Sequence, residues 1–244
     1  MELPQLQVKQ FSEQSYWDAR HKGEALGYEW YRDYASLRPV LTRHLPRQEP
    51  ILQLGVGTSA IQTDMVLRDS YTAVHSVDYS PVAIERLEAA RVESASAQLQ
   101  GALSYEVADM RALGRHEDGC FGGILDKGAL DALLCGDNGE ADAAAALREA
   151  WRLLAPGAAY LMITSASPRA RLPVITGAGV PWASVLVYEV GQRGALAGPF
   201  EVRLGAASGG GGGGGGDVDG MLGGAVGRLP EMGYSHMCYA CVKP

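Results

Sequence analysis

Short apolar runs alternate with amphipathic segments across residues 51–164 of this 244-residue chain. The runs are apolar throughout, which predicts strands in a sheet that is covered on both faces. We expect five such strands, at residues 51–54, 72–77, 103–108, 121–125 and 158–164. The amphipathic segments between them predict helices at 59–67, 81–92 and 141–154. Strands separated by helices predict parallel βαβ units and a doubly wound sheet.

The alternation breaks after Ser167. Residues 182–190 and 234–242 predict two more strands with no clear helix between them, and we expect these to pair antiparallel at one end of the sheet. The predicted fold is therefore α/β: a doubly wound, mostly parallel seven-stranded sheet with an antiparallel C-terminal strand pair. It forms a single domain over residues 1–244, and its first helical segments predict an N-terminal helical cap over residues 1–46.

A glycine-rich stretch interrupts the C-terminal part of the chain and includes an unbroken run from Gly209 to Gly216. Such a run brings no side chains to bury and loses much conformational freedom when it is ordered. We therefore expect a flexible insertion at residues 205–228, without a function of its own.

The overall charge narrows the classes of partner. The chain carries 28 acidic and 21 basic residues, a net charge of −7, whereas nucleic-acid binding needs clustered Lys and Arg. No segment reaches the roughly 20 apolar residues of a membrane helix. The N-terminus lacks the apolar run of a secretory signal, and the four cysteines lack the spacing of a disulfide framework. We expect a cytoplasmic protein without nucleic-acid or membrane partners.

Two predicted strands end in residues that are typical of a cofactor site. Gly55 and Gly57 follow the first strand, at the edge where open α/β sheets bind ligands. Asp78 ends the second strand, at an offset where an acid accepts hydrogen bonds from ribose hydroxyls. Each signal has a plainer alternative, because the glycines also suit an ordinary tight turn and Asp78 also suits a helix cap.

Acids follow the next two strands as well, with Asp109 placed to accept from an adenine amino group and Asp126 beside Lys127. Nicotinamide cofactors carry a pyrophosphate and favour three glycines in the turn, but the third position here is Ala60. S-adenosylmethionine has no phosphate and carries a positive sulfonium. An acid-rich rim with a shortened glycine motif therefore favours S-adenosylmethionine.

Other kinds of site find little support in the sequence. Cys238 and Cys241 lie in a predicted strand, where residues three apart point to opposite faces, so we interpret both as structural. The five histidines show no ligand spacing, and we expect no metal site. A Gly-x-Ser-x-Gly elbow is absent, which argues against Ser-His-Asp chemistry.

Seven short motifs occur in order between roughly residues 15 and 167: YWDARH, YEWY, ILQLGVGTS, HSVDYS, YEVADMRAL, ILDKGALDALL and LLAPG. In this combination they resemble the methyltransferase-like family of class I S-adenosylmethionine enzymes, and within it the elongation factor 1-alpha lysine methyltransferases. The resemblance implies a Rossmann-like methyltransferase fold. It also implies S-adenosylmethionine as cofactor, S-adenosylhomocysteine as product, and a protein substrate that is methylated on lysine.

The same resemblance implies roles for individual residues. Members of the family cover the methionine end of the cofactor with N-terminal aromatic residues, hold the ribose with an acid, and place further residues beside the adenine. Carried to this chain, the cofactor-binding set is Trp17, Arg20, His21, Trp30, Gly55, Gly57, Asp78, Tyr79, Asp109, Met110 and Lys127. His21 stands where relatives often have tyrosine, and the chain diverges most after Ser167, in a region that usually helps to hold the substrate.

The implied chemistry requires a neutral lysine amine, although the pKa of free lysine is about 10.4. Burial in an aromatic channel lowers that pKa, and Trp30 and Tyr28 are expected to wall the channel or simply to pack onto the sheet. A carboxylate near the amine orients it and accepts its proton. Asp126 and Asp131 are the two candidate catalytic carboxylates.

Three other functions remain open at this point. The chain could be a methyltransferase for a small molecule, with a closed pocket built by the region after Ser167. It could also bind the cofactor without catalysis and act as a partner protein. A nicotinamide-linked oxidoreductase on the same sheet fits the motifs least.

Overall fold

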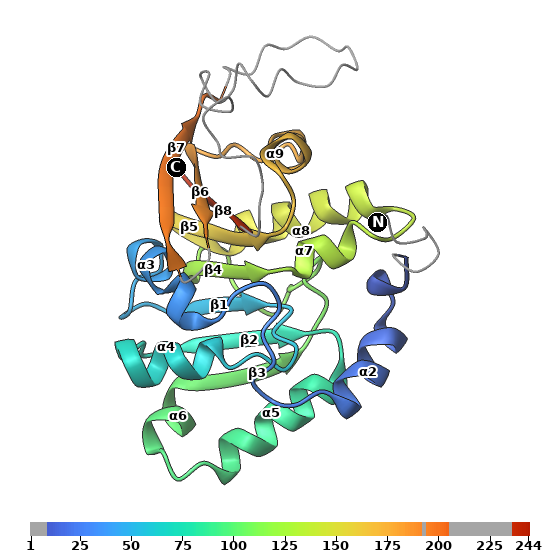
Figure 1. Ribbon diagram of the computed structural model, residues 1–244, viewed down its shortest axis with the longest axis vertical. Coiled ribbons are helices and arrows are strands. Elements are labelled where there is room, and N and C mark those ends of the chain that lie inside the picture. The colour runs from blue at the N-terminus through green and yellow to red at the C-terminus, as the bar shows by residue number, and fades with distance from the viewer. Residues whose placement is uncertain (1–8, 192–193, 205–235) are drawn as a thin grey trace.

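The computed structural model describes residues 9–191, 194–204 and 236–244. A single sheet runs through them in the order β3-β2-β1-β4-β5-β8-β6-β7 (Figure 1). Its strands are β1 (Ile51–Leu54), β2 (Val74–Asp78), β3 (Leu103–Val107), β4 (Phe121–Lys127), β5 (Leu154–Thr164), β6 (Ser184–Val190), β7 (Leu196–Val202) and β8 (His236–Val242). The predicted glycine-rich insertion, residues 205–228, lies outside the described residues.

The helical elements are η1 (Gln10–Ser12), α2 (Gln14–Gly23), α3 (Tyr34–His44), α4 (Ile61–Asp69), α5 (Pro81–Glu93), α6 (Ala97–Ala102), α7 (Ala129–Leu133), α8 (Gly139–Leu153) and α9 (Pro168–Gly177). None of the helices in the described ranges is long and apolar enough to cross a membrane. The predicted start of α5 is confirmed, because the Ser80 side chain accepts a hydrogen bond from the Ala83 amide and Pro81 follows it.

The sheet is buried on both faces, as its apolar strands require. Alternate residues of β5 belong to different core clusters: Tyr160 and Met162 pack with α8 and α9, whereas Leu161 and Ile163 pack with α3 and α4. The strands from β3 to β5 pair in parallel. The predicted α/β fold with a mostly parallel sheet is confirmed.

The C-terminal part differs from the prediction. The two predicted strands do pair antiparallel, as β6 and β8, but β8 is inserted between β5 and β6. The sheet has an eighth strand among the described residues, β7, which pairs with β6 at the edge, so the count of seven was wrong. Gly198 and Pro199 lie inside β7 and break its strand pattern, and edge strands tolerate such residues because one side is unpaired.

Helix α9 was missed for a similar reason. Its sequence, PRARLPVITG, carries Pro173 inside the helix, so propensity argues against a helix there. Burial decides instead, since Leu172 and Ile175 are fully buried in the core beside α8. Tertiary packing thus outweighs local propensity in this segment.

Figure 1 shows how the fold creates a site. The parallel strands point to one edge of the sheet, at the right of the view, and η1 and α2 lie across that edge. Strand β1 sits between β2 and β4, so the chain order reverses there. Open α/β sheets bind ligands in the crevice at such a reversal. Helix α3, the later part of the predicted cap, packs instead on a face of the sheet.

Candidate active site

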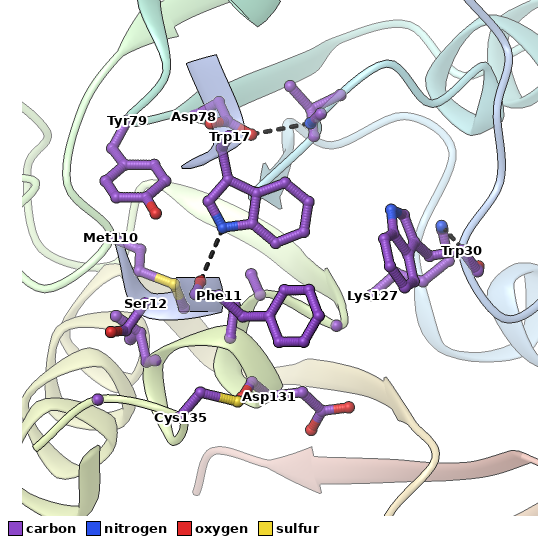
Figure 2. A pocket seen from close by; sticks show the side chains of 18 of the residues that line it. Phe11, Ser12, Trp17, Trp30, Asp78, Tyr79, Met110, Lys127, Asp131 and Cys135 are labelled. Carbon is purple, nitrogen blue, oxygen red and sulfur yellow. Dashed lines mark hydrogen bonds between the residues drawn. The ribbon is translucent and has the colours of Figure 1, made fainter. Parts of the chain in front are cut away.

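A cavity of about 590 Å³ opens at the carboxyl ends of β1, β2 and β4. This volume is typical of a site for a small molecule or cofactor. The turn after β1 forms its floor, and the residues after β2 and β3 form one wall. The start of α7 forms another wall, and η1, α2 and the connection to α3 cover the cavity (Figure 2).

The turn after β1 depends on its two glycines. Gly55 has a φ of +59°, and a Cβ there would lie 2.5 Å from the Cβ of Ala129. Gly57 has a φ of +54°, and a Cβ there would lie 3.4 Å from Nε2 of His21. Any other residue would be strained at both positions and would meet a neighbour at the first. The floor of the cavity is therefore bare backbone.

Asp78 lies at the end of β2 and is 5% exposed. Its Oδ2 accepts a hydrogen bond of 2.8 Å from the Gly57 amide, and its Oδ1 accepts one of 2.9 Å from the Ser80 amide. Burial raises the pKa of this carboxyl group, and the two amides oppose that shift. Each oxygen can accept a further hydrogen bond, and Asp78 lines the cavity. The carboxylate is thus held firmly and can still accept from hydroxyl groups.

The wall beside Asp78 contains Tyr79 and Met110, as Figure 2 shows. Asp109 is also in this wall, but Arg111 holds it by hydrogen bonds of 3.0 Å from Nε and 2.6 Å from Nη2. Burial raises the pKa of Asp109, yet the hydrogen bonds and charge of Arg111 bring it below its ordinary value. Asp109 is therefore an ionised acceptor that already has a partner.

Aromatic side chains of the N-terminal segment cover the cavity. The Trp17 indole donates a 2.7 Å hydrogen bond to the Phe11 carbonyl, and its ring lies 5.9 Å from that of Trp30. His21 packs against Trp17 and is 2% exposed. Within the described part of the chain its Nδ1 has no hydrogen-bond partner, and burial lowers the pKa of the ring. The cover therefore contains a buried polar atom that no described residue satisfies.

Arg20 takes a different place from the other predicted residues, because it is not among those that line the cavity. Its guanidinium lies 4.7 Å from the centre of the Trp30 ring and pairs with Glu24 at 2.8 Å. Glu24 in turn accepts a 2.7 Å hydrogen bond from the Thr58 hydroxyl in the turn after β1. Arg20 thus stabilises the cover without lining the cavity and, through Glu24, joins the cover to the turn after β1.

Lys127 lines the cavity at the end of β4, with its ammonium group almost fully buried. It donates a 2.9 Å hydrogen bond to the Trp30 carbonyl and pairs with Glu29 at 3.0 Å. Burial lowers the pKa of Lys127, and the charge of Glu29 opposes that shift. Glu29 also accepts from the Ser59 hydroxyl and, at 2.7 Å, from the Ala60 amide.

The sequence did not single out Glu24 or Glu29, although they hold the cover on the turn. Glu29 lies inside the YEWY motif, and the turn after β1 carries two hydroxyl groups, Thr58 and Ser59, that need acceptors. The two hydroxyl groups were the sequence feature that indicated a need for acceptors near the turn. Their partners, however, lie 30 and 34 residues away in the sequence, and only the fold brings them together.

The two candidate catalytic carboxylates have unlike surroundings. Asp126 is fully buried outside the wall of the cavity, and accepts from the Ala129 amide at 2.9 Å and the Tyr160 hydroxyl at 2.6 Å. Burial raises the pKa of Asp126 to about 6. It therefore holds the start of α7, where a carboxylate satisfies free amides.

Asp131 lies on α7 in the wall of the cavity. It accepts a 2.6 Å hydrogen bond from the Tyr31 hydroxyl and 2.8 Å bonds from the Thr164 hydroxyl. Arg171 pairs with it, and two other nitrogens of this buried guanidinium lack hydrogen-bond partners among the described residues. Of the two carboxylates, only Asp131 can meet a molecule in the cavity.

Among the known proteins to which this chain is similar are methyltransferases. Residues 52–162 match a family model described as a methyltransferase domain. EEF1A lysine methyltransferase 4 of Mus musculus is 36% identical over 181 residues, which cover 70% of this chain and 68% of that protein. The eEF1A lysine and N-terminal methyltransferase of Danio rerio is 32% identical over 161 residues, which cover 65% of this chain and 22% of that protein.

A solved structure shares the fold over nearly the whole chain. It is the N-methyltransferase NodS from Bradyrhizobium japonicum WM9, in complex with S-adenosylhomocysteine. The two superpose with a TM-score of 0.57 at 15% sequence identity, over 96% of this chain and 98% of the other. At this identity the likeness concerns the fold.

Proposed function

The chain belongs to the class I S-adenosylmethionine-dependent methyltransferases, and from that premise we propose that it methylates a lysine side chain of a protein related to elongation factor 1-alpha. S-adenosylmethionine is the cofactor. Two relatives, at 36% and 32% identity, are named as lysine methyltransferases of eEF1A, and these names support a lysine of elongation factor 1-alpha as the acceptor. The observation that carries the proposal is a carboxylate, Asp131, which is bonded to Tyr31 and lines the same cavity as Trp30.

The residues of the cavity fit the cofactor. Bare backbone at Gly55 and Gly57 admits a ligand where a Cβ would obstruct it. Acceptor capacity on Asp78 suits ribose hydroxyls, and the unpartnered Nδ1 of His21 leaves a polar atom for the ligand. We propose that Asp78, Tyr79, Asp109 and Met110 hold the adenosine, and that Trp17, His21, Trp30, both glycines and Lys127 hold the methionine part. Arg20 acts through Trp30 and Glu24.

The acceptor amine belongs at the Asp131 side of the cavity. When bound, S-adenosylmethionine supplies a methyl group on a sulfonium that needs no further activation. The task of the chain is to position a neutral amine, exclude water and accept the released proton. Aromatic rings at Tyr28, Trp30 and Tyr31 provide the apolar surroundings that lower the pKa of an amine and attract a cation.

Asp131 is suited to orient that amine. Hydrogen bonds from Tyr31 and Thr164, together with the ion pair to Arg171, fix the direction of its oxygens. An ammonium group of the substrate can pair with it, and the proton can leave along the same contact. We assign the catalytic role to Asp131, and to Asp126 the positioning of α7.

The proposal is tested by incubating the purified chain with elongation factor 1-alpha and methyl-labelled S-adenosylmethionine. Mass spectrometry of the substrate is expected to show a methylated lysine, and a Lys→Arg substitution at that position removes the label. Transfer to a small molecule of a cell extract instead of any protein would identify a small-molecule methyltransferase. Cofactor binding without any labelled product would identify a non-catalytic binding protein. Either outcome would overturn the proposal.

A further inference from the structure

A cluster of two histidines and a glutamate lies at the β2–β3 edge of the sheet, and none of the three lines the active-site cavity. His75 comes from β2, Glu106 from β3 and His116 from the connection to β4. Both Nε2 atoms face the same carboxylate oxygen, Oε2 of Glu106, at 3.3 Å from His75 and 3.1 Å from His116. One ligand atom from each residue lies within 4.8 Å of the other two.

We propose that His75, Glu106 and His116 form a binding site for one divalent zinc ion. Zinc in proteins is bound tetrahedrally by histidine nitrogen and carboxylate oxygen at about 2.0–2.2 Å. Two ligands at that distance and angle are separated by roughly 3.3 Å, which is close to both distances found here. Two histidines with one carboxylate suit zinc better than magnesium or calcium, which prefer oxygen ligands alone.

The surroundings also suit a metal site. Ser104 Oγ lies 2.8 Å from Nδ1 of His75, where it can accept the proton of a ring that is ligated through Nε2. The ring of Phe121 stacks on His75 with an interplanar angle of 18° and limits its rotation. The three ligand side chains are 19–20% exposed, so an ion can enter from solvent and a water molecule can complete four ligands.

No local pattern indicates this site, because positions 75, 106 and 116 lack the short spacing of metal ligands. The parallel register of the sheet brings His75 opposite Ser104, and Glu106 lies two residues further along the same strand. Each ring thereby places its Nε2 atom within hydrogen-bond distance of the Glu106 carboxyl group.

An ion at this place would tie the connection after β3 to two strands. His116 precedes β4, and its carbonyl oxygen accepts a 2.9 Å hydrogen bond from Arg152 of α8. The zinc would therefore stabilise an edge of the sheet and take no part in methyl transfer. This separates the test from that of the proposed function, because metal binding is measured without cofactor or substrate.

The test uses the full chain without an affinity tag, titrated with zinc chloride in a calorimeter and with cobalt(II) in a spectrophotometer. We expect one zinc ion per chain, a tetrahedral cobalt spectrum, and a higher unfolding temperature when zinc is bound. The double substitution His75→Gln and His116→Gln is expected to weaken zinc binding at least 100-fold. The control, His44→Gln, changes a histidine that is bonded to Tyr188 on another part of the sheet, and leaves zinc affinity unchanged.

Arg115 provides a second variant that leaves all three ligands in place. Its guanidinium is 88% exposed and lies 3.6 Å from Oε1 of Glu106, where it repels a bound cation. Arg115→Gln is therefore expected to tighten zinc binding by about two- to fivefold at low salt. If the wild-type chain showed no saturable zinc binding, or if the double variant bound zinc as tightly as the wild type, the site would be refuted.

Discussion

Asp126 and Asp131 belong to one sequence motif but serve different ends. The sequence placed Asp126 directly after a strand and Asp131 further along the same motif, and it gave both the same candidate role. Helix α7 separates their roles. Asp126 precedes the helix and accepts from the amide of its first residue, Ala129, whereas Asp131 lies within the helix and lines the cavity. The sequence thus predicted the two carboxylates, but the direction in which each side chain points depends on how α7 is placed.

Replacing Asp131 by Asn is expected to lower the rate of methyl transfer by about 100-fold, because a neutral amide neither orients the ammonium form nor accepts its proton. S-adenosylhomocysteine affinity stays within about threefold, since the proposed cofactor contacts are elsewhere. The substitution also leaves the buried Arg171 unpaired, which costs about 3 kcal/mol of stability.

A second variant separates activity from stability. Adding Arg171→Met to Asp131→Asn removes the unpaired charge and is expected to recover most of the lost stability without recovering activity. Turnover and urea unfolding of the single and double variants provide the comparison. Full activity in a folded Asp131→Asn variant would refute its catalytic role.

Asp126 makes stability depend on pH in a specific direction. Burial raises the pKa of Asp126 to about 6 in the folded state, from 3.8. The folded chain therefore binds this proton more tightly, so the stabilisation is complete below about pH 4 and is lost as pH rises through 6. The loss reaches up to about 3 kcal/mol, since each pKa unit corresponds to about 1.4 kcal/mol.

Asp126→Asn cannot gain or lose this proton, so it isolates the effect. Between pH 4 and pH 7, the free energy of unfolding of the wild type is expected to fall relative to that of the variant. Urea titrations at four pH values measure the difference. A difference that stays constant over this range would show that the pKa of Asp126 is not raised.

At the scale of elements, the start of α5 links the fold to the cover of the site. The Ser80 hydroxyl caps α5 and also donates a 2.6 Å hydrogen bond to Asp18 on α2. Residue patterns predicted the cap, because a serine before a proline is typical of a helix start. The link to α2 spans 62 residues, and no local pattern reports such a contact.

Ser80→Ala is expected to cost about 1 kcal/mol of stability and to weaken S-adenosylhomocysteine binding by about three- to tenfold, because α2 loses a charged hydrogen bond to the fold. Ser96→Ala is the matched control, since Ser96 caps α6 through the Leu99 amide. It is expected to cost similar stability without changing affinity. Equal affinities for both variants would show that the link between Ser80 and Asp18 does not hold the cover in place.

The elements themselves were predictable to different degrees. Strands β1, β2, β4 and β5 followed from apolar runs, since a parallel sheet buries both faces of its inner strands. Elements α9 and β7 were missed because Pro173 and Pro199 lie inside them and oppose their local patterns. Tertiary packing stabilises both elements, and the sequence of a single segment does not show which parts of the chain it packs against.

At the scale of the whole molecule, strand order explains where the site lies. β1 is flanked by β2 and β4, and the chain reverses its order there, so the glycine turn and Asp78 meet at one crevice. Alternating strands and helices were enough to predict that meeting. The cover was predictable only in outline, because the contacts of Glu24 and Glu29 join it to the turn across long sequence separations.

Asp78 is the residue on which cofactor binding is expected to depend most, and calorimetric titration with S-adenosylhomocysteine tests its role most directly. The wild type is expected to bind with micromolar or tighter affinity, and Asp78→Asn at least tenfold more weakly, because hydroxyl groups lose a charged acceptor. Asp64→Asn, which changes an acid paired with Arg68 on α4, is expected to bind as the wild type does. Equal affinity for Asp78→Asn and the wild type, or no binding by the wild type, would show that Asp78 does not hold the cofactor in this cavity.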